Sequence, residues 1–389
     1  MIVAIRGIGG GVGTTVALGA SLLGSKEYQT KTGGSILAHA NWRKVSLPAM
    51  QDIKFYGWDW GHGTLGERAK LVGVLTDSEL SQVPTIVRDF RPRPAPRRPH
   101  DAFYSFLPSE QAIAMTASQA VEYYVEELTQ LRQTEEEVVG FNLASTESIN
   151  WDCQKIQNRS DLLGAIKANC DSLSGGMVFA YACILTGIPF CDFTPDLTLE
   201  CPAIQSLAKK NKVPLAGKDG NTGQSFLKAV VGEMFVRRNI AIRGWYSANV
   251  LGNTDGQVLT VPGHSDTKKR DKLNVLESII PYEFGHVVDI SYEKSRGDFK
   301  EAWDSLNMEG WLGRRLTFRM DWCAPDSVLA APLVIDVSRL LWLSRRRGLG
   351  GIQRQLSPFF KSPIGVKRTS IISEINAMES FYGATPFWA

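Results

Sequence analysis

Residues 2–15 read Ile2-Val3-Ala4-Ile5-Arg6-Gly7-Ile8-Gly9-Gly10-Gly11-Val12-Gly13-Thr14-Thr15. An apolar strand, a glycine-rich turn and a helix, predicted over 16–23, follow one another here as in a phosphate-binding βα turn. Glycine lets the backbone approach a pyrophosphate closely. The free N–H groups of the helix N-terminus, with the hydroxyl groups of Thr14 and Thr15, attract the anion. The density of glycine favours this interpretation over a tight turn without a ligand.

Strand and helix patterns alternate over the first 220 residues and predict a doubly wound parallel sheet of the α/β class. We expect buried strands at 137–143 and 189–195, and helices at 118–132, 176–187 and 202–210. The first of these strands continues into a polar end of the kind that lines a cofactor crevice, Ala144-Ser145-Thr146-Glu147.

The sequence changes character after residue 220. Residues 240–246 and 315–320 show period-two features, which predict a separate mixed or antiparallel sheet. The apolar run 328–343 then predicts a long helix that returns to the first domain. The length of 389 residues is sufficient for two domains.

The second strand decides which dinucleotide the glycine turn would hold. An acidic residue at the end of that strand binds the ribose in the dinucleotide fingerprint. We predict the strand at 35–40, which ends without an acidic residue and is followed by Arg43 and Lys44. This pattern leaves NAD and NADP both open.

Composition excludes several classes of protein. A formal net charge of +3 is too weak for a general nucleic-acid binder, and no uninterrupted apolar run is long enough to span a bilayer. The six cysteines form no Cys-x-x-Cys pair, so we expect small buried side chains in a reducing cytoplasm. Residues 91–100, rich in Pro and Arg, predict an exposed polyproline-like loop.

Four cations occupy five positions in Lys268-Lys269-Arg270-Asp271-Lys272. On a helix predicted over 267–280, with Asp266 or Thr267 as the N-cap, Lys268 and Lys272 share the face of Leu276 and Ile279. Arg270 and Glu277 point away. A buried ammonium needs a counter-anion, so the two lysines could clamp a phosphate or stabilise an oxyanion. Lysine stems that merely cover the edge of a core fit the pattern equally well.

Three further stretches carry a charged residue in an unusual setting. Lys300 lies in Gly297–Asp304, which we predict to open a helix, and Lys361 lies among aromatic residues in 358–363. Asp219 lies in the glycine-rich turn 217–224. Taken singly, each favours a structural role.

Together these stretches resemble the inositol-1-phosphate synthase family, most of all its short archaeal and bacterial members. The order and spacing of the matches hold over about 140–389 and the first 20 residues. The matching segments are 7–15, Ala144–Glu147, Gly217–Gly223, Leu251–Gly256, Lys268 and Lys272 with Asn274-Val275, Gly297-Asp298-x-Lys300, Asp326–Pro332 and Phe360–Pro363.

The resemblance implies an NAD-dependent cyclisation of glucose 6-phosphate to inositol 1-phosphate. In the family the carbon-5 hydroxyl is oxidised, carbon 6 forms an enolate that attacks the carbon-1 aldehyde, and the resulting ketone is reduced again. There is no net redox change. The resemblance also implies NAD rather than NADP, and a homotetramer. It implies a Rossmann-type NAD-binding domain of residues 1–225 and 326–389, with an inserted α+β catalytic and tetramerisation domain at 226–325.

The resemblance also assigns site residues by motif. The catalytic set is Lys268, Lys272, Lys300 and Lys361, with Asp219 and Asp326 as acidic partners. The NAD-binding set is Gly7, Gly9, Gly10, Gly11, Val12, Gly13, Thr14, Thr15, Ala144, Ser145, Thr146, Glu147, Gly217, Asp219, Asn253, Asp255, Asp326 and Ser327. The substrate-binding set is Asn249, Gly252, Asn253, Lys268, Lys272, Asn274, Lys300 and Lys361. Some members need a divalent cation, for which Asp255 is the candidate ligand.

The sequence departs from the family at the lysine pairs. Members commonly repeat Ser-Lys, whereas this chain has Thr267-Lys268 and Asp271-Lys272, and Asp271 adds a negative charge. The departure leaves open the same chemistry on fructose 6-phosphate, which would give a five-membered cyclitol phosphate. An ordinary NAD(P) dehydrogenase of a sugar phosphate, with net NADH production, is a second alternative, and a non-enzymatic nucleotide sensor is a third.

Overall fold

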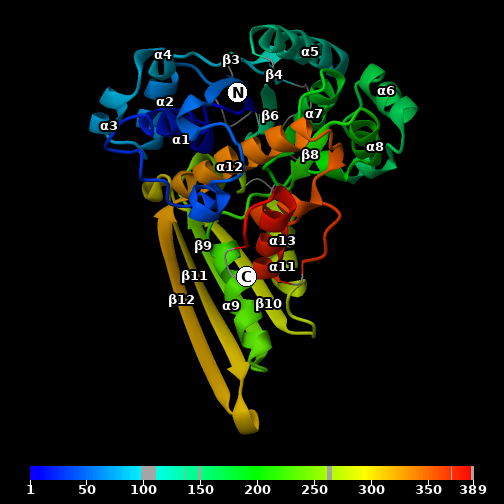
Figure 1. Cartoon of the computed structure of the whole chain (residues 1–389). Helices are drawn as coiled ribbons and strands as arrows, with labels where there is room; N and C mark the ends of the chain where they lie inside the picture. The colour runs from blue at the N-terminus through cyan, green and yellow to red at the C-terminus, as the bar shows by residue number, and fades with distance from the viewer. Residues whose placement is uncertain (98–110, 136, 148–149, 261–264, 369, 387–389) are drawn as a thin grey trace.

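The computed structural model describes residues 1–97, 111–135, 137–147, 150–260, 265–368 and 370–386 (Figure 1). Two sheets organise the chain. A parallel sheet with helices on both faces forms the upper part of the view, and a second sheet of long strands extends away from it.

The first sheet has seven strands in the order β13-β8-β7-β6-β1-β2-β3, and every neighbouring pair is parallel. Its strands are β1 (Ile2–Arg6), β2 (Lys54–Asp59), β3 (Arg93–Pro94), β6 (Val138–Asn142), β7 (Phe190–Asp192), β8 (Pro214–Gly217) and β13 (Gly351–Ile352). All five residues of β1 are buried, as its unbroken apolar run requires of a central parallel strand. The chain builds outward from β1 to β2 and then crosses to β6, so the strand order reverses between β1 and β6. Ligands bind at such a point, beyond the carboxyl ends of the strands.

Helices cover both faces of this sheet, as a doubly wound fold requires. One face carries α1 (Gly11–Leu22) packed on α12 (Asp326–Arg346), and the other carries α5 (Ala117–Thr134) packed on α7 (Gly175–Leu185). The other helices of this part are α2 (Leu65–Val72), α3 (Asp77–Gln82), α4 (Thr85–Arg88), α6 (Arg159–Lys167), α8 (Pro202–Lys210) and α13 (Ile371–Tyr382). The helices predicted at 118–132, 176–187, 202–210 and 328–343 are confirmed to within a few residues.

The second sheet is mixed, as predicted. Its order is β10-β9-β11-β12; β9 and β10 run parallel, and the other neighbours run antiparallel. The strands are β9 (Ala241–Leu251), β10 (Gly285–Tyr292), β11 (Phe299–Glu309) and β12 (Arg315–Pro325). Three helices belong to this part of the chain: α9 (Gln224–Arg237), α10 (Thr254–Val258) and α11 (Ser265–Glu277). An apolar cluster that includes Phe235, Trp245 and Leu276 joins α9 and α11 to one face of the sheet.

The predicted second strand was wrong. Residues 35–40 form short 3₁₀ turns, η1 (Ile36–Ala38) and η2 (Ala40–Trp42), and the strand next to β1 is β2, fourteen or more residues later. The turns form because a buried carboxylate distant in sequence binds them: Asp336 accepts from Ser35 Oγ at 2.7 Å and from Leu37 N at 3.3 Å. The true strand ends in Asp59, the acidic residue that was missing from the predicted one.

Two other local predictions were also wrong. Residues 299–304 are strand, not helix, because Lys300, Ala302 and Asp304 alternate inward with period two and the segment pairs with β9 and β12. Residues 93–97 form two short strands, β3 at the edge of the first sheet and β4 (Pro96–Arg97) beside β5 (Ile113–Ala114). Residues 98–100 of the predicted loop lie outside the described residues.

Among the helices of the described residues, α12 alone is long and apolar enough to cross a membrane, judged by length and composition. Of its most apolar window, 67% is buried against the sheet, which is the situation of a core helix in a soluble protein. The six cysteines are free thiols, four of them buried, whereas Cys323 on β12 is exposed.

Candidate active site

The glycine turn packs against the polar end of β6. Gly7 has a φ of +90°, and a Cβ there would lie 2.7 Å from the backbone nitrogen of Ala144. A Cβ on Gly11 would lie 2.7 Å from Ser327 Oγ at the start of α12. The turn therefore lies against two of the segments assigned with it to a cofactor, and side chains larger than hydrogen do not fit there.

The N-terminus of α1 fits a dinucleotide pyrophosphate. Gly10 is the N-cap, no side chain caps the helix, and its first turn holds no acidic residue, an arrangement that favours an anion at the positive end of the helix dipole. Thr14 corrects the sequence-based expectation: its hydroxyl donates to the carbonyl oxygens of Gly10 and Gly11 and is not aimed at the turn. Backbone N–H groups, rather than the Thr14 hydroxyl, would hold the anion.

Asp59 and Arg68 are site residues that the sequence analysis missed. Asp59 accepts from Gly9 N at 2.9 Å and from Gly61 N at 3.0 Å, and it forms an ion pair with Arg68 at 3.0 Å. Arg68 Nε donates to the Gly9 carbonyl oxygen at 2.7 Å. The end of β2 thus shapes the glycine turn, in the position where a dinucleotide-binding sheet carries its ribose-binding acid.

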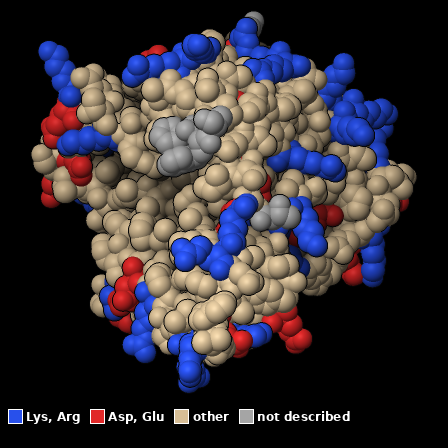
Figure 2. All heavy atoms as spheres, turned by 60° about the horizontal axis from the view of Figure 1, so that its bottom comes forward, with Lys and Arg blue, Asp and Glu red and all other residues tan. Residues whose placement is uncertain are grey.

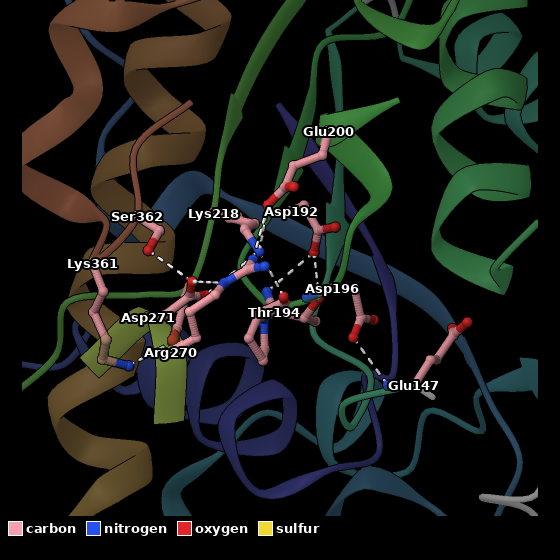
Figure 3. A network of polar contacts seen from close by, with 12 residues as sticks. Glu147, Asp192, Thr194, Asp196, Glu200, Lys218, Arg270, Asp271, Lys361 and Ser362 are labelled. Atoms are coloured by element: carbon pink, nitrogen blue, oxygen red, sulfur yellow. Dashed lines mark hydrogen bonds and ion pairs between the residues drawn. The ribbon is translucent and has the colours of Figure 1, made fainter. Parts of the chain in front are cut away.

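Glu147 is buried and joins several elements of the fold. It forms an ion pair with Arg6 at 2.6 Å and accepts from the Gly175 N–H at the start of α7 at 2.7 Å. Its own N–H donates to Asp196 at 3.0 Å (Figure 3). Burial is the main cause that raises the pKa of Asp196 well above its usual value. Of the assigned segment, Ala144 lies directly against Gly7 of the turn.

The assigned lysines come from three separate elements and meet in one place. Lys268 and Lys272 lie on α11, Lys300 on β11, and Lys361 directly after the turn η9 (Arg354–Phe359). Helix α11 begins at Ser265, so Asp266 lies in its first turn and the predicted cap was displaced. Lys272, Lys300 and Lys361 are each less than a tenth exposed.

Three of the four lysines have a carboxylate partner. Lys361 Nζ lies 2.6 Å from Asp219 Oδ1, Lys300 Nζ lies 3.3 Å from Asp326 Oδ1, and Lys268 Nζ binds Asp255. Burial lowers the pKa of Lys268, but Asp255 and Asp219 outweigh burial and the net shift is upward. Lys268 therefore keeps its positive charge at neutral pH. Asp219 adopts a φ of +56° to face Lys361, a conformation that Asp tolerates better than most residues.

Lys272 has no carboxylate in contact among the described residues. Its Nζ donates to two neutral carbonyl oxygens, Asn249 Oδ1 at 2.8 Å and Gln224 Oε1 at 3.2 Å. Burial, followed by the charges of Lys300 and Lys361, lowers its pKa well below the usual value. Lys272 is thus a buried amine whose charged form has only neutral partners among the described residues.

The remaining assigned residues differ in how they meet the site. Asn249 contacts Lys272, and Asn253 Nδ2 donates to Asp298 at 3.3 Å beside Ser327. A Cβ on Gly252 would lie 2.5 Å from Gly297 N, so this glycine is required by packing. Asn274 is exposed on α11. Gly217, whose Cβ would lie 2.8 Å from the Asp192 carbonyl oxygen, places Asp219 by its close packing.

The described residues do not fit a protein-bound metal site. Asp255, the assigned ligand, is occupied by the Lys268 ammonium. Groups of three or more His, Cys, Asp or Glu side chains placed to hold an ion do not occur in the described ranges. A cation at Asp255 would first have to displace Lys268.

Asp271 contacts Ser362 and Lys218 rather than one of the four assigned lysines. Its carboxylate accepts from Ser362 Oγ at 2.8 Å and lies 3.5 Å from Lys218 Nζ (Figure 3). Burial raises its pKa to about 6, while Lys218 is the main opposing charge. Arg270, predicted to point away from the face of Lys268 and Lys272, pairs with Glu200 at 3.2 Å. The unusual acid therefore belongs to an ion-pair network with Lys218 and Glu200 that adjoins the lysine site, since Asp219 is among the charges that raise its pKa.

A glycine turn at the switch point of a parallel sheet, beside a buried group of lysines, defines an NAD(P)-type α/β enzyme with a site for an anionic substrate. Comparison with known proteins narrows this class. The family described as myo-inositol-1-phosphate synthase matches residues 1–380. The chain is 33% identical to inositol-3-phosphate synthase 1 of Bacteroides thetaiotaomicron, over 93% of this chain and 89% of that protein. The chain belongs to the myo-inositol-1-phosphate synthase family.

More distant relatives share the fold. Inositol-3-phosphate synthase of the plant Spirodela polyrhiza is 28% identical over 78% of this chain, which spans 62% of that protein. The inositol-3-phosphate synthase structure from Caenorhabditis elegans superposes with a TM-score of 0.88 at 21% identity, covering 98% of this chain and 85% of that one. A myo-inositol-1-phosphate synthase-related protein from Thermotoga maritima gives 0.84 at 24% identity, covering 100% and 99%.

Proposed function

We propose that this chain converts glucose 6-phosphate to an inositol phosphate by NAD-dependent oxidation, enolisation, intramolecular aldol addition and re-reduction, with no net redox change. The observation that carries the proposal is the meeting of four lysines and two aspartates within a chain of this family. NAD supplies the reversible oxidation of the substrate; everything else is the work of the residues described above.

The substrate phosphate belongs beside Lys272. A phosphate dianion provides the counter-charge that this lysine lacks and restores its pKa, so substrate binding and protonation of Lys272 reinforce each other. Asn249 and Gln224 hold the amine in place and leave it a hydrogen-bonding position for the phosphate.

The three paired lysines suit the oxygens that gain charge during the reaction. Lys268, Lys300 and Lys361 remain close to one another and to Asp326, whose pKa is lowered against burial by Lys300, Lys268 and Lys361. Cations fixed in a water-poor site stabilise an alkoxide or an enolate oxygen. Asp219 and Asp326 orient the Lys361 and Lys300 amines.

Two further proposals concern assembly and location. The outward face of the second sheet exposes Tyr246, Val287 and Trp303, an apolar surface suited to the tetramer that the family resemblance implies. Its strands come from 241–325, which supports an inserted domain at 226–325 between the segments 1–225 and 326–389.

Six free thiols suit the cytoplasm. Lys and Arg form separate groups on the face in Figure 2, with Asp and Glu among them, which suits a small substrate better than nucleic acid.

Phosphorus NMR of the purified protein with NAD tests the proposal. Glucose 6-phosphate and fructose 6-phosphate are offered in separate tubes while NADH absorbance is followed. The expected result is a new phosphate ester from glucose 6-phosphate without accumulation of NADH. Product from fructose 6-phosphate alone would change the ring, and steady NADH production would indicate a dehydrogenase. Asp271 is part of the departure from the family that left fructose 6-phosphate open as a substrate. Its contact with Lys218 gives that ketose no particular support.

A further inference from the structure

A buried polar layer separates the lysine site from the apolar core of the second sheet. On β9 and β11, Asn249 pairs in register with Ala302, Ser247 with Asp304, and Trp245 with Leu306. Lys272 binds at the first of these rows, and the third row belongs to the apolar cluster. The middle row therefore places a charged residue, Asp304, where the rest of this face is apolar.

Asp304 is fully engaged by hydrogen-bond donors. Its Oδ1 accepts from Ser247 Oγ at 2.5 Å and from Trp245 Nε1 at 2.7 Å, and its Oδ2 accepts from Gln224 Nε2 at 2.7 Å. Lys228 on α9 completes the layer, with Nζ 2.7 Å from Ser247 Oγ and 3.8 Å from Asp304 Oδ1. The side chains of Lys228 and Asp304 are 1% and 0% exposed. Because a buried ion pair is seldom worth its desolvation, a pair with every partner supplied points to a role beyond stability.

The carboxylate of Asp304 determines which way the Gln224 amide faces. A carboxylate only accepts hydrogen bonds, so Gln224 must present its NH₂ group to Asp304 and its carbonyl oxygen to Lys272. The reverse orientation would set two donors against each other at Lys272 and two acceptors at Asp304. We propose that Asp304 and Lys228 form a positioning pair, which fixes the Gln224 amide and through it directs the Lys272 amine toward the substrate phosphate.

The pair also balances charge behind Lys272. The charged groups that act on Lys272 are Lys268 on its own helix, Lys300 on β11, Lys228 on α9, and Lys361. Asp304 on β11 reaches Lys272 through the Gln224 amide, and Asp219 and Asp326 bind Lys361 and Lys300. Burial lowers the pKa of Lys228 to about 8, although the nearby Asp304 carboxylate acts in the opposite direction. His286 Nε2 lies 3.4 Å from Lys228 Nζ. Burial and Lys228 lower the pKa of His286 to about 3, so this ring is neutral. Removing either member of the pair leaves one uncompensated charge near Lys272.

The two members should therefore shift Lys272 in opposite directions. Asp304→Asn leaves the Lys228 cation unbalanced and disfavours a charged Lys272. The amide introduced at position 304 can also donate to Gln224, so the Gln224 amide is no longer held in one orientation. Lys228→Met leaves the Asp304 anion unbalanced and favours a charged Lys272. A purely structural pair would lower stability in both variants and would not give opposite shifts in pH dependence.

The inference rests on the proposed function, because it assigns the substrate phosphate to Lys272, and the experiment separates the two. The alkaline limb of kcat/KM for glucose 6-phosphate is measured in the wild type, Asp304→Asn, Lys228→Met and the double variant. Binding of inorganic phosphate is titrated calorimetrically across the same pH range. Asp77→Asn and Lys210→Met, both at exposed positions, serve as matched controls for loss of one charge.

Asp304→Asn should shift the alkaline limb of kcat/KM and the pH dependence of phosphate binding to lower pH. It should also raise KM by about ten- to a hundred-fold, the loss expected when a hydrogen bond to a charged group is broken. Lys228→Met should shift both pH dependences to higher pH. The double variant should restore the position of the limb but keep the raised KM. Shifts of both single variants in the same direction, or no shift in either folded variant, would overturn the proposal. If wild type fails to cyclise glucose 6-phosphate, the proposed function is wrong and the inorganic phosphate titrations still decide the role of the pair.

Discussion

The buried pair between Asp219 and Lys361 gives a prediction that separates stability from catalysis. The two side chains are 4% and 8% exposed and lie 2.6 Å apart. Asp219→Asn leaves a buried ammonium without its carboxylate, which costs about 3–5 kcal/mol. An unfolding entropy of about 2.1 cal/mol/K per residue gives about 0.8 kcal/mol/K for the chain, so Tm should fall by about 4–6 °C.

The chain offers a matched control for this perturbation. Lys155 and Asp152 form an ion pair at 2.7 Å, but their side chains are 79% and 60% exposed. Asp152→Asn should therefore cost less than about 1 kcal/mol. Lys361→Met should destabilise the chain as Asp219→Asn does, whereas the double variant removes both charges and should recover most of the stability.

The assay combines thermal unfolding with turnover of glucose 6-phosphate. The double variant should be nearly as stable as the wild type and yet inactive, because the Lys361 cation is lost from the site. The reasoning fails if Asp219→Asn lowers Tm no more than Asp152→Asn does, or if the double variant retains normal turnover.

Three further changes test other parts of the structure. Asp59→Ala should weaken NAD binding by about 10–100-fold, since the Gly9 N–H and Arg68 lose their charged partner; NAD titration monitored calorimetrically measures this. Burial raises the pKa of Asp336 to about 7, so its contribution to stability is complete below about pH 4 and is lost as pH rises through 7. Unfolding scans should show Tm falling between about pH 4 and 7 in the wild type, and less in Asp336→Asn. Trp303→Asp on the outward sheet face should dissociate the proposed tetramer, and light scattering would instead show an unchanged mass if that face is not an interface.

Local signals predicted the parts of the fold that depend on neighbouring residues. The turn at 2–15 follows from its glycines, and α8 begins and ends where Pro202 and Lys210 indicate. Helical spacing also placed Lys268 and Lys272 on the inward side of α11. Each of these features is encoded within a few turns of chain.

Features that depend on distant partners could not be predicted. Residues 35–40 have a strand-like composition, but the turns there depend on Asp336, some 300 residues later. Residues 299–304 contain good helix formers, and pairing with β9 and β12 overrides that preference. The neutral partners of Lys272 come from α9 and β9, so the lowered pKa of this lysine was visible only in the folded chain.

The most direct test of the central claim follows one hydrogen atom. Glucose 6-phosphate carrying deuterium at carbon 5 is incubated with the enzyme, NAD⁺ and a pool of unlabelled NADH, and the product is examined by mass spectrometry and deuterium NMR. Oxidation and re-reduction within one active site predict that the deuterium returns to the same carbon without exchange with free NADH. Loss of deuterium to the NADH pool, with an oxidised sugar phosphate as the product, would contradict the cyclisation.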